Sequence, residues 1–141
     1  MTPIKRALRT ERFVHIGLLL MVVLALDTAY RVKPHHNRIS PIMVYAIAFV
    51  CLNNIGLAGF FRSRFVKRSE DSLRSNPTDE SALRRWRQGV LNSLVMAYSV
   101  VLLGFLLKVM GATWDIAGWF FLVGVLLLLA WTPRLSVPAT P

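Results

Sequence analysis

The stretch of sequence that decides the fold is Gly89 to Met110, which reads GVLNSLVMAYSVVLLGFLLKVM. Its only charged residue is Lys108, which lies close to its end. A helix of this length rises about 33 Å, enough to cross the hydrocarbon layer of a bilayer, which is about 30 Å thick. The stretch therefore predicts a transmembrane helix.

Three further apolar stretches have nearly the same length, at residues 13–30, 41–61 and 116–132. Of the 141 residues of the chain, 55% are apolar and 17% are charged. An ordinary soluble domain is less apolar and more highly charged than this. The fold class that we predict is an all-α integral membrane protein with four transmembrane helices.

The connections between the stretches predict how the helices pair. Residues 31–40 and 111–115 are short links, and links of this length join neighbouring antiparallel helices. We therefore expect two antiparallel hairpins, one spanning residues 13–61 and the other spanning residues 89–132. The longer polar segment 62–88 is the expected linker between them.

The linker contains a good signal for the start of a helix. Asn76 is a residue type that caps helices, and Pro77 suits the first helical position, where its missing amide hydrogen does no harm. No strong helix breaker follows before the apolar stretch that begins at Gly89. We therefore expect a helix from about residue 77, so that the third helix extends beyond the membrane into the cytoplasm.

The expected extension carries an apolar stripe opposite a basic face. Leu83 and Trp86 recur at helical spacing, and Arg84 and Arg85 lie on the other side. Two interpretations stay open at this point. The stripe is either a docking surface for a partner, or it lies on lipid headgroups or on the linker of the chain itself.

The basic residues predict orientation, because Lys and Arg in short loops stay on the cytoplasmic side. Of the 17 Lys and Arg residues, 13 fall in residues 1–12, 62–88 and 133–141. We therefore expect a basic N-terminus, a linker and a tail in the cytoplasm, with both termini on that side. The membrane that we expect is the bacterial cytoplasmic membrane, with a mitochondrial membrane as the alternative.

Aromatic residues near the ends of the predicted helices agree with this orientation, because Tyr and Trp favour the headgroup region. The expected interface anchors are Tyr30, Tyr45, Trp86, Trp114 and Trp131. The formal net charge of +10 then serves as an orientation signal beside anionic headgroups. We expect membrane lipids as partners and no nucleic acid.

Small residues at regular spacing predict where the helices pack, since they let backbones approach closely within a bilayer. The residues expected in this role are Gly56, Ser93, Ala97 and Gly104.

Few polar residues fall deep within the predicted helices. They include Asn53 and Asn54 in the second helix, and Asn92 and Ser99 in the third. None of these side chains titrates near neutral pH. An interhelical hydrogen bond from Asn53 or Asn54 to the third helix, near the turn from Asn92 to Met96, is the interpretation that we favour.

In size and helix number the chain resembles the small proton-coupled four-helix exporters. The resemblance implies a carboxylate in the middle of the first helix, where protons exchange for substrate. At that depth this chain has Met21 and Val22 instead. Motifs for nucleophilic catalysis, phosphate loops and metal sites are also missing from the sequence. We therefore expect no catalytic, cofactor-binding or metal-binding residues, and we do not expect an enzyme.

The function hypothesis that remains is a non-catalytic accessory or scaffold subunit, which packs against a larger membrane complex. The expected protein partners are other membrane subunits or further copies of the chain. The alternative is a small oligomeric channel or transporter whose polar path is lined by Asn53, Asn54, Asn92 and Ser99. An immunity-type or holin-like membrane protein is a third reading.

Overall fold

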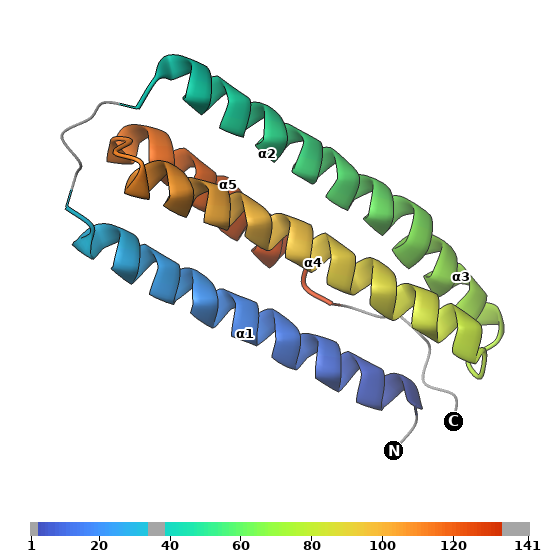
Figure 1. Cartoon of the computed structure of the whole chain (residues 1–141). Helices are drawn as coiled ribbons and strands as arrows, with labels where there is room; N and C mark the ends of the chain where they lie inside the picture. Colours follow the sequence, from blue (N-terminus) through green and yellow to red (C-terminus); the bar gives the residue numbers. More distant parts are fainter. Residues whose placement is uncertain (1–2, 34–38, 134–141) are drawn as a thin grey trace.

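The computed structural model describes residues 3–33 and 39–133, and the regular structure in this part of the chain is entirely helical. The elements are α1 (Pro3–Arg31), α2 (Pro41–Phe61), the π-helix η1 (Arg62–Lys67), α3 (Arg68–Ser75), α4 (Glu80–Val109) and α5 (Trp114–Ala130). Elements α2, η1 and α3 run on without a break from Pro41 to Ser75. If this continuous helix is counted once, the described residues form four helical rods: α1, the continuous helix from α2 to α3, α4 and α5 (Figure 1).

Three of the rods are long and apolar enough to cross a membrane: Ile4–Arg31, Pro41–Ser75 and Glu80–Val109. The fourth, α5, is apolar and has 17 residues, a rise of about 25 Å. Within the described residues, the prediction of an all-helical fold with four apolar helices is therefore confirmed.

The helix ends differ from the expected ones mainly outside the apolar stretches. The predicted range 41–61 coincides with α2. The predicted range 116–132 begins and ends two residues after α5 does. In contrast, α1 begins at Pro3 rather than near residue 13. Most of the basic N-terminus is thus part of a helix. The expected tail lies outside the described residues from residue 134 onward.

The expected linker is largely a helical hairpin, which corrects the sequence-based interpretation. Residues 62–75 continue the second helix, and only residues 76–79 form a turn before α4. The cap of α4 is Asp79 rather than Asn76: its Oδ1 accepts from the backbone N–H groups of Ser81 (2.9 Å) and Ala82 (3.1 Å). Asn76 misses this role because its Oδ1 accepts hydrogen bonds from Thr78 within the turn.

The π-helix passes close to α4 at Gly89. A Cβ atom on Gly89 would meet the Phe65 Cβ at 2.9 Å and the Val66 Cγ2 at 3.0 Å. Only glycine allows the two backbones to approach this closely without a shift. Gly89 therefore does not end α4 but sets its contact with η1.

Helix α4 is the centre of the molecule and contacts every other helical element. Helices α1 and α2 lie on different sides of α4 and do not contact each other within the described residues (Figure 1). The expected pairing of the first two apolar stretches as a hairpin is therefore wrong, because their link is long enough to let α4 come between them. The buried core runs along α4 and includes Trp86, Leu94 and Val101.

Candidate functional site

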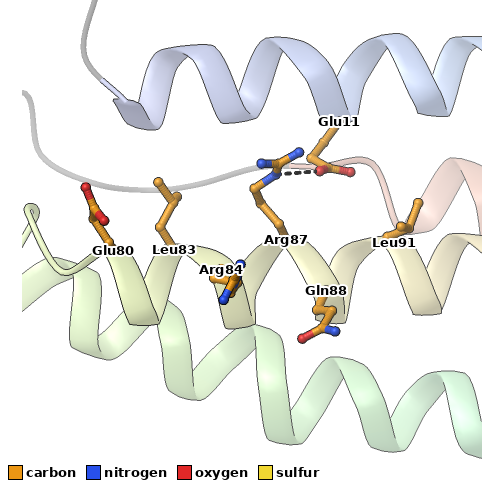
Figure 2. Close-up of a pocket in the computed structure, with 7 residues that line it drawn as sticks. All are labelled: Glu11, Glu80, Leu83, Arg84, Arg87, Gln88 and Leu91. Atoms are coloured by element: carbon orange, nitrogen blue, oxygen red, sulfur yellow. Dashed lines mark hydrogen bonds and ion pairs between the residues drawn. The ribbon is translucent and has the colours of Figure 1, made fainter.

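Two buried polar side chains project from α1 into the molecule at the end where α3 meets α4. Glu11 is 3% exposed and His15, four residues further along the helix, is 6% exposed. Residues four apart lie on one face of a helix. The Nε of Arg87 on α4 donates a hydrogen bond of 3.1 Å to Glu11 Oε1, which forms an ion pair between the two helices (Figure 2).

His15 connects α1 to the end of α5. Its Nε2 lies 2.8 Å from the backbone oxygen of Leu128. Because a carbonyl oxygen only accepts hydrogen bonds, Nε2 is the atom that carries the proton. Leu128 is within the last four residues of α5, whose carbonyl groups lack partners in their own helix. His15 therefore acts as a cap for α5.

The second oxygen of Glu11 has no hydrogen-bond partner among the described residues, although it is buried. Glu11 and Arg87 line a recess of about 430 Å³ on the side of α4 (Figure 2). The other lining residues are Glu80, Leu83, Arg84, Gln88 and Leu91. We call this the Glu11 recess. A carboxylate with one oxygen paired can accept a hydrogen bond from an entering donor at the other oxygen.

Glu11 was not among the residues predicted from the sequence. Residues 1–12 were expected to form a basic N-terminus outside the first apolar stretch, because the hydropathy rises only near residue 13. A helical signal was present nonetheless: Ala7, Glu11 and His15 recur at intervals of four and continue to Val22, and all four side chains are buried.

Two of the polar residues that the sequence analysis named, Asn54 and Ser99, meet across two helices. The side-chain Nδ2 of Asn54 on α2 donates a hydrogen bond of 2.8 Å to Ser99 Oγ on α4. Ser99 Oγ in turn donates to the backbone oxygen of Met96 at 2.7 Å. The acceptor is thus Ser99, one turn beyond the expected position, and the hydrogen bond joins α2 to α4.

The other two residues of the expected polar path do not join this pair. Asn53 is exposed, and its Nδ2 donates to the backbone oxygen of Phe49 on the same helix at 2.9 Å. Asn92 is half-buried on α4. Of the four residues, the described structure therefore brings together only Asn54 and Ser99.

The small residues of α4 pack as expected from their spacing. Ser93 and Ala97 are buried, and Ser93 Oγ donates to the backbone oxygen of Gly89 at 2.7 Å. A Cβ atom on Gly104 would lie 2.9 Å from the Cβ of Phe120 on α5. Gly56 is different: it is exposed, and a Cβ atom at this position would have no neighbour within 4 Å. Gly56 therefore packs against no other helix in the described structure.

The aromatic residues expected as interface anchors divide into two groups. Tyr30 and Tyr45 are exposed by 80% and 75%, and Trp114 is also exposed, with Lys108 Nζ 5.0 Å from its ring centre. Trp131 is half-buried, and the guanidinium of Arg62 lies 6.0 Å from its ring centre. These four rings are accessible at or near the ends of their helices.

Trp86 is fully buried, so it neither anchors to headgroups nor faces a partner. Its Nε1 donates a hydrogen bond of 3.4 Å to Glu70 Oε1 on α3. Leu83 is half-buried against the same core, while Arg84 and Arg85 are exposed. Trp86 thus packs against the chain's own helix α3, which corrects the docking interpretation for this residue.

A different face of α4 is left uncovered by the other described residues. Five apolar residues on this helix are 40–49% exposed: Leu91, Val95, Leu102, Leu106 and Val109. Their intervals of four, seven, four and three residues place them on one side of the helix. The first of them also lines the Glu11 recess. We call these residues the open stripe; it spans about 27 Å.

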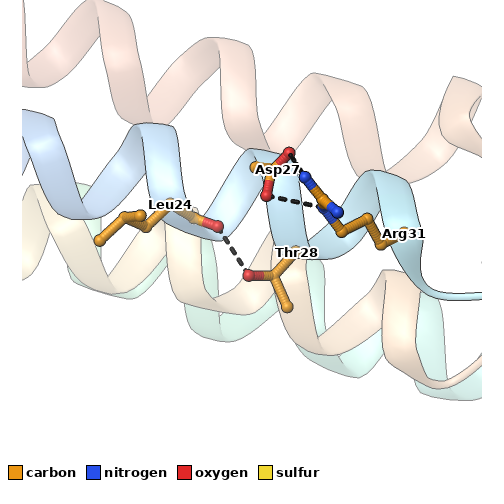
Figure 3. Close-up of polar contacts among 4 residues, drawn as sticks. All are labelled: Leu24, Asp27, Thr28 and Arg31. Atoms are coloured by element: carbon orange, nitrogen blue, oxygen red, sulfur yellow. Dashed lines mark hydrogen bonds and ion pairs between the residues drawn. The ribbon is translucent and has the colours of Figure 1, made fainter.

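The far end of α1 carries an exposed polar group (Figure 3). Arg31 donates to both carboxylate oxygens of Asp27, at 2.9 Å from Nε and 3.2 Å from Nη2. Thr28 Oγ1 donates to the backbone oxygen of Leu24 at 2.8 Å. Because Asp27 and Arg31 are exposed, their contact adds little to stability.

The described residues contain no group of three or more His, Cys, Asp or Glu side chains that could hold a metal ion. Comparison with family models, with curated proteins and with solved structures found no match. The candidate site therefore consists of the Glu11 recess and the open stripe that leads away from it along α4.

Proposed function

We propose that this protein is an integral membrane accessory or scaffold subunit, and that the open stripe of α4 receives a transmembrane helix of a larger membrane protein. The observation that carries this proposal is the arrangement around α4. The central helix exposes an apolar face along about 27 Å, about the thickness of a bilayer interior. Helices α1 and α2 stand on different sides of α4 without touching each other.

The membrane assignment is supported by the surface of the outer helices. Large apolar side chains such as Leu20, Val23, Phe49 and Leu52 are more than 60% exposed. Isolated exposed apolar residues are normal on a soluble protein, but long contiguous faces are not. By the distribution of basic residues, the end of the molecule with the α3–α4 turn lies in the cytoplasm.

The Glu11 recess supplies the polar part of the proposed interface. It lies at one end of the open stripe, since Leu91 belongs to both. The unpaired oxygen of Glu11 accepts a hydrogen bond from a donor on the incoming helix. We therefore propose a partner helix that is apolar along its length and carries a Lys, Arg, Ser or Thr side chain near its cytoplasmic end.

The channel or transporter hypothesis has less support. Its polar path needs Asn53, Asn54, Asn92 and Ser99 to line one passage, but Asn54 and Ser99 already satisfy each other and Asn53 bonds within its own helix. An oligomer would have to break these contacts or leave them outside the path. We therefore place the accessory function first.

The test is the mass of the protein purified in a mild detergent from membranes of its host, by native mass spectrometry. We expect a complex with one larger, unrelated membrane protein at fixed stoichiometry. Leu102→Trp fills the open stripe and should abolish this complex, whereas Leu126→Trp, on the exposed face of α5, should leave it intact. A lone monomer of 15.9 kDa, or a homo-oligomer insensitive to Leu102→Trp, would contradict the proposal.

A further inference from the structure

A cleft between η1, α3 and α4 gathers three arginine residues. It holds about 230 Å³ and is lined by Arg64, Phe65, Arg68, Ser69, Ser72 and Arg85. We call it the arginine cleft. It is distinct from the Glu11 recess, with which it shares no lining residue. No acidic side chain is among its lining residues, so its charge is positive.

None of the three guanidinium groups forms an ion pair with a carboxylate of the described residues, although Asp79 lies close enough to Arg85 to interact with it electrostatically. The two ion pairs formed by described residues lie elsewhere, within α1 and between α1 and α4. Like charges around one small space repel each other, and a bound anion would remove that repulsion. Arginine is also the side chain that best matches a phosphate group, because its planar fork offers parallel N–H donors.

The three arginine side chains of the cleft are exposed, and two of them are restrained by contacts with neighbouring residues. Arg64 is held over the ring of Phe60, with its guanidinium carbon 5.7 Å from the ring centre. Arg85 Nη2 donates to Ser81 Oγ at 3.3 Å. Ser69 also lines the cleft and is only 3% exposed. The first two contacts restrain the guanidinium groups of Arg64 and Arg85.

The depth of the cleft favours a lipid as the source of the anion. Arg64 lies three residues beyond Phe61, the last residue of α2, and Arg85 lies four residues before Gly89, where the apolar part of α4 begins. At about 1.5 Å per residue, both are about 4–6 Å outside the apolar segments. The headgroup layer occupies about 5–8 Å on each side of the hydrocarbon.

We infer that the arginine cleft binds the phosphate group of an anionic membrane lipid. The inference rests on the proposed function only in taking the helices to span a membrane, and it does not require a protein partner. A basic cleft beside membrane helices on the cytoplasmic side is suited to such headgroups. Bound there, the lipid would tie the hairpin of α3 and α4 to the membrane surface.

The experiment measures lipid binding to the full chain in detergent by native mass spectrometry, titrated with phosphatidylglycerol and, separately, with phosphatidylcholine. We expect a first phosphatidylglycerol to bind at least tenfold more tightly than phosphatidylcholine. The triple variant Arg64→Gln, Arg68→Gln, Arg85→Gln should lose this preference. The matched control Arg6→Gln, Lys67→Gln, Arg74→Gln removes the same charge from exposed positions outside the cleft and should keep it.

A second variant separates a formed site from diffuse charge. Ser69→Ala keeps all of the charge and should weaken phosphatidylglycerol binding about threefold, with the helical circular dichroism unchanged. Equal loss of preference in both triple variants would overturn the inference, and so would competition by inorganic phosphate at the same concentration as the lipid. Failure of the chain to remain in membranes after alkaline carbonate washing would instead overturn the membrane assignment itself.

Discussion

Glu11 and Arg87 form an ion pair of 3.1 Å whose two side chains differ sharply in exposure. The side chain of Glu11 is 4% exposed, whereas that of Arg87 is 50% exposed. Burial removes most of the contact between the Glu11 carboxylate and water, so the ion pair with Arg87 is needed to offset the cost of burying its charge. The charge of the Arg87 guanidinium is stabilised by solvent even without the ion pair, since half of this side chain is exposed.

This asymmetry predicts unequal effects of the two neutral substitutions. Arg87→Gln leaves a buried carboxylate without its charge partner and should lower the free energy of unfolding by about 2 kcal/mol, a value reduced from that of fully buried pairs because solvent reaches this one. Glu11→Gln leaves a solvated arginine and should cost about 0.5 kcal/mol. Steric trapping in micelles measures both. Equal losses would contradict the assigned burial.

Close packing between α4 and α5 predicts a sharp difference between two glycines of α5. A Cβ atom on Gly124 would lie 2.5 Å from Val101 Cγ2 and 3.0 Å from the Val101 backbone nitrogen. Gly124→Ala should therefore lower the free energy of unfolding by about 1–3 kcal/mol. Gly118→Ala is the matched control, because a Cβ there has nothing within 4 Å. A destabilisation of similar size at Gly118 would refute this packing.

The hydrogen bond between Asn54 and Ser99 predicts a position-specific effect within an adjacent pair of asparagines. Asn54→Ala should cost about 0.6–2 kcal/mol, the usual value of an interhelical hydrogen bond in a bilayer. Asn53→Ala, which removes only a bond within α2, should change stability by less than about 0.5 kcal/mol. In a double-mutant cycle, Asn54→Ala and Ser99→Ala should be coupled. Additive losses would show that the bond does not form.

Asp79 predicts a pH dependence of the turn between α3 and α4. The hydrogen bond from the Ser81 side chain, followed by that from the Ala82 backbone, holds the pKa of Asp79 below its ordinary value of 3.8. A carboxyl group with a lowered pKa in the folded state stabilises the fold above its unfolded pKa, and this stability is lost as the pH falls through the folded value.

The amide protons of Ser81 and Ala82 report this loss. Relative to unstructured peptide rates, their protection from hydrogen exchange should fall as the pH drops below about 4. In Asp79→Asn, which keeps an oxygen acceptor but does not titrate, protection should stay constant over the same range. Identical pH profiles in the two proteins would exclude Asp79 as the titrating cap.

The apolar segments could be predicted from sequence because a helix that is able to cross a membrane needs a long run of apolar residues. Residues 41–61 coincide with α2 for this reason. The arrangement of the helices could not be predicted in the same way, because leucine and valine serve equally well against lipid and against protein. The separation of α1 from α2 by α4 is seen in the contacts between the helices, which no hydropathy pattern reveals.

The candidate site could be predicted only in part, and each error concerns an individual residue. Asn53 and Asn54 are adjacent, so they point about 100° apart on the helix, and the sequence does not tell which one faces α4. Glu11 was missed because its ion pair requires the helix to continue beyond the apolar stretch, and Trp86 was misplaced because residues 62–75 are helical and cover it.

The most direct test of the accessory function is photo-crosslinking from the open stripe in native membranes. A benzophenone amino acid replacing Leu102 should form one discrete adduct with a larger membrane protein. The same amino acid replacing Leu126 on α5 should not form this adduct. When Leu106→Trp is added to the variant with the benzophenone at position 102, the adduct should disappear. Adducts of equal yield from both positions, or an adduct only with a second copy of the chain, would contradict the account.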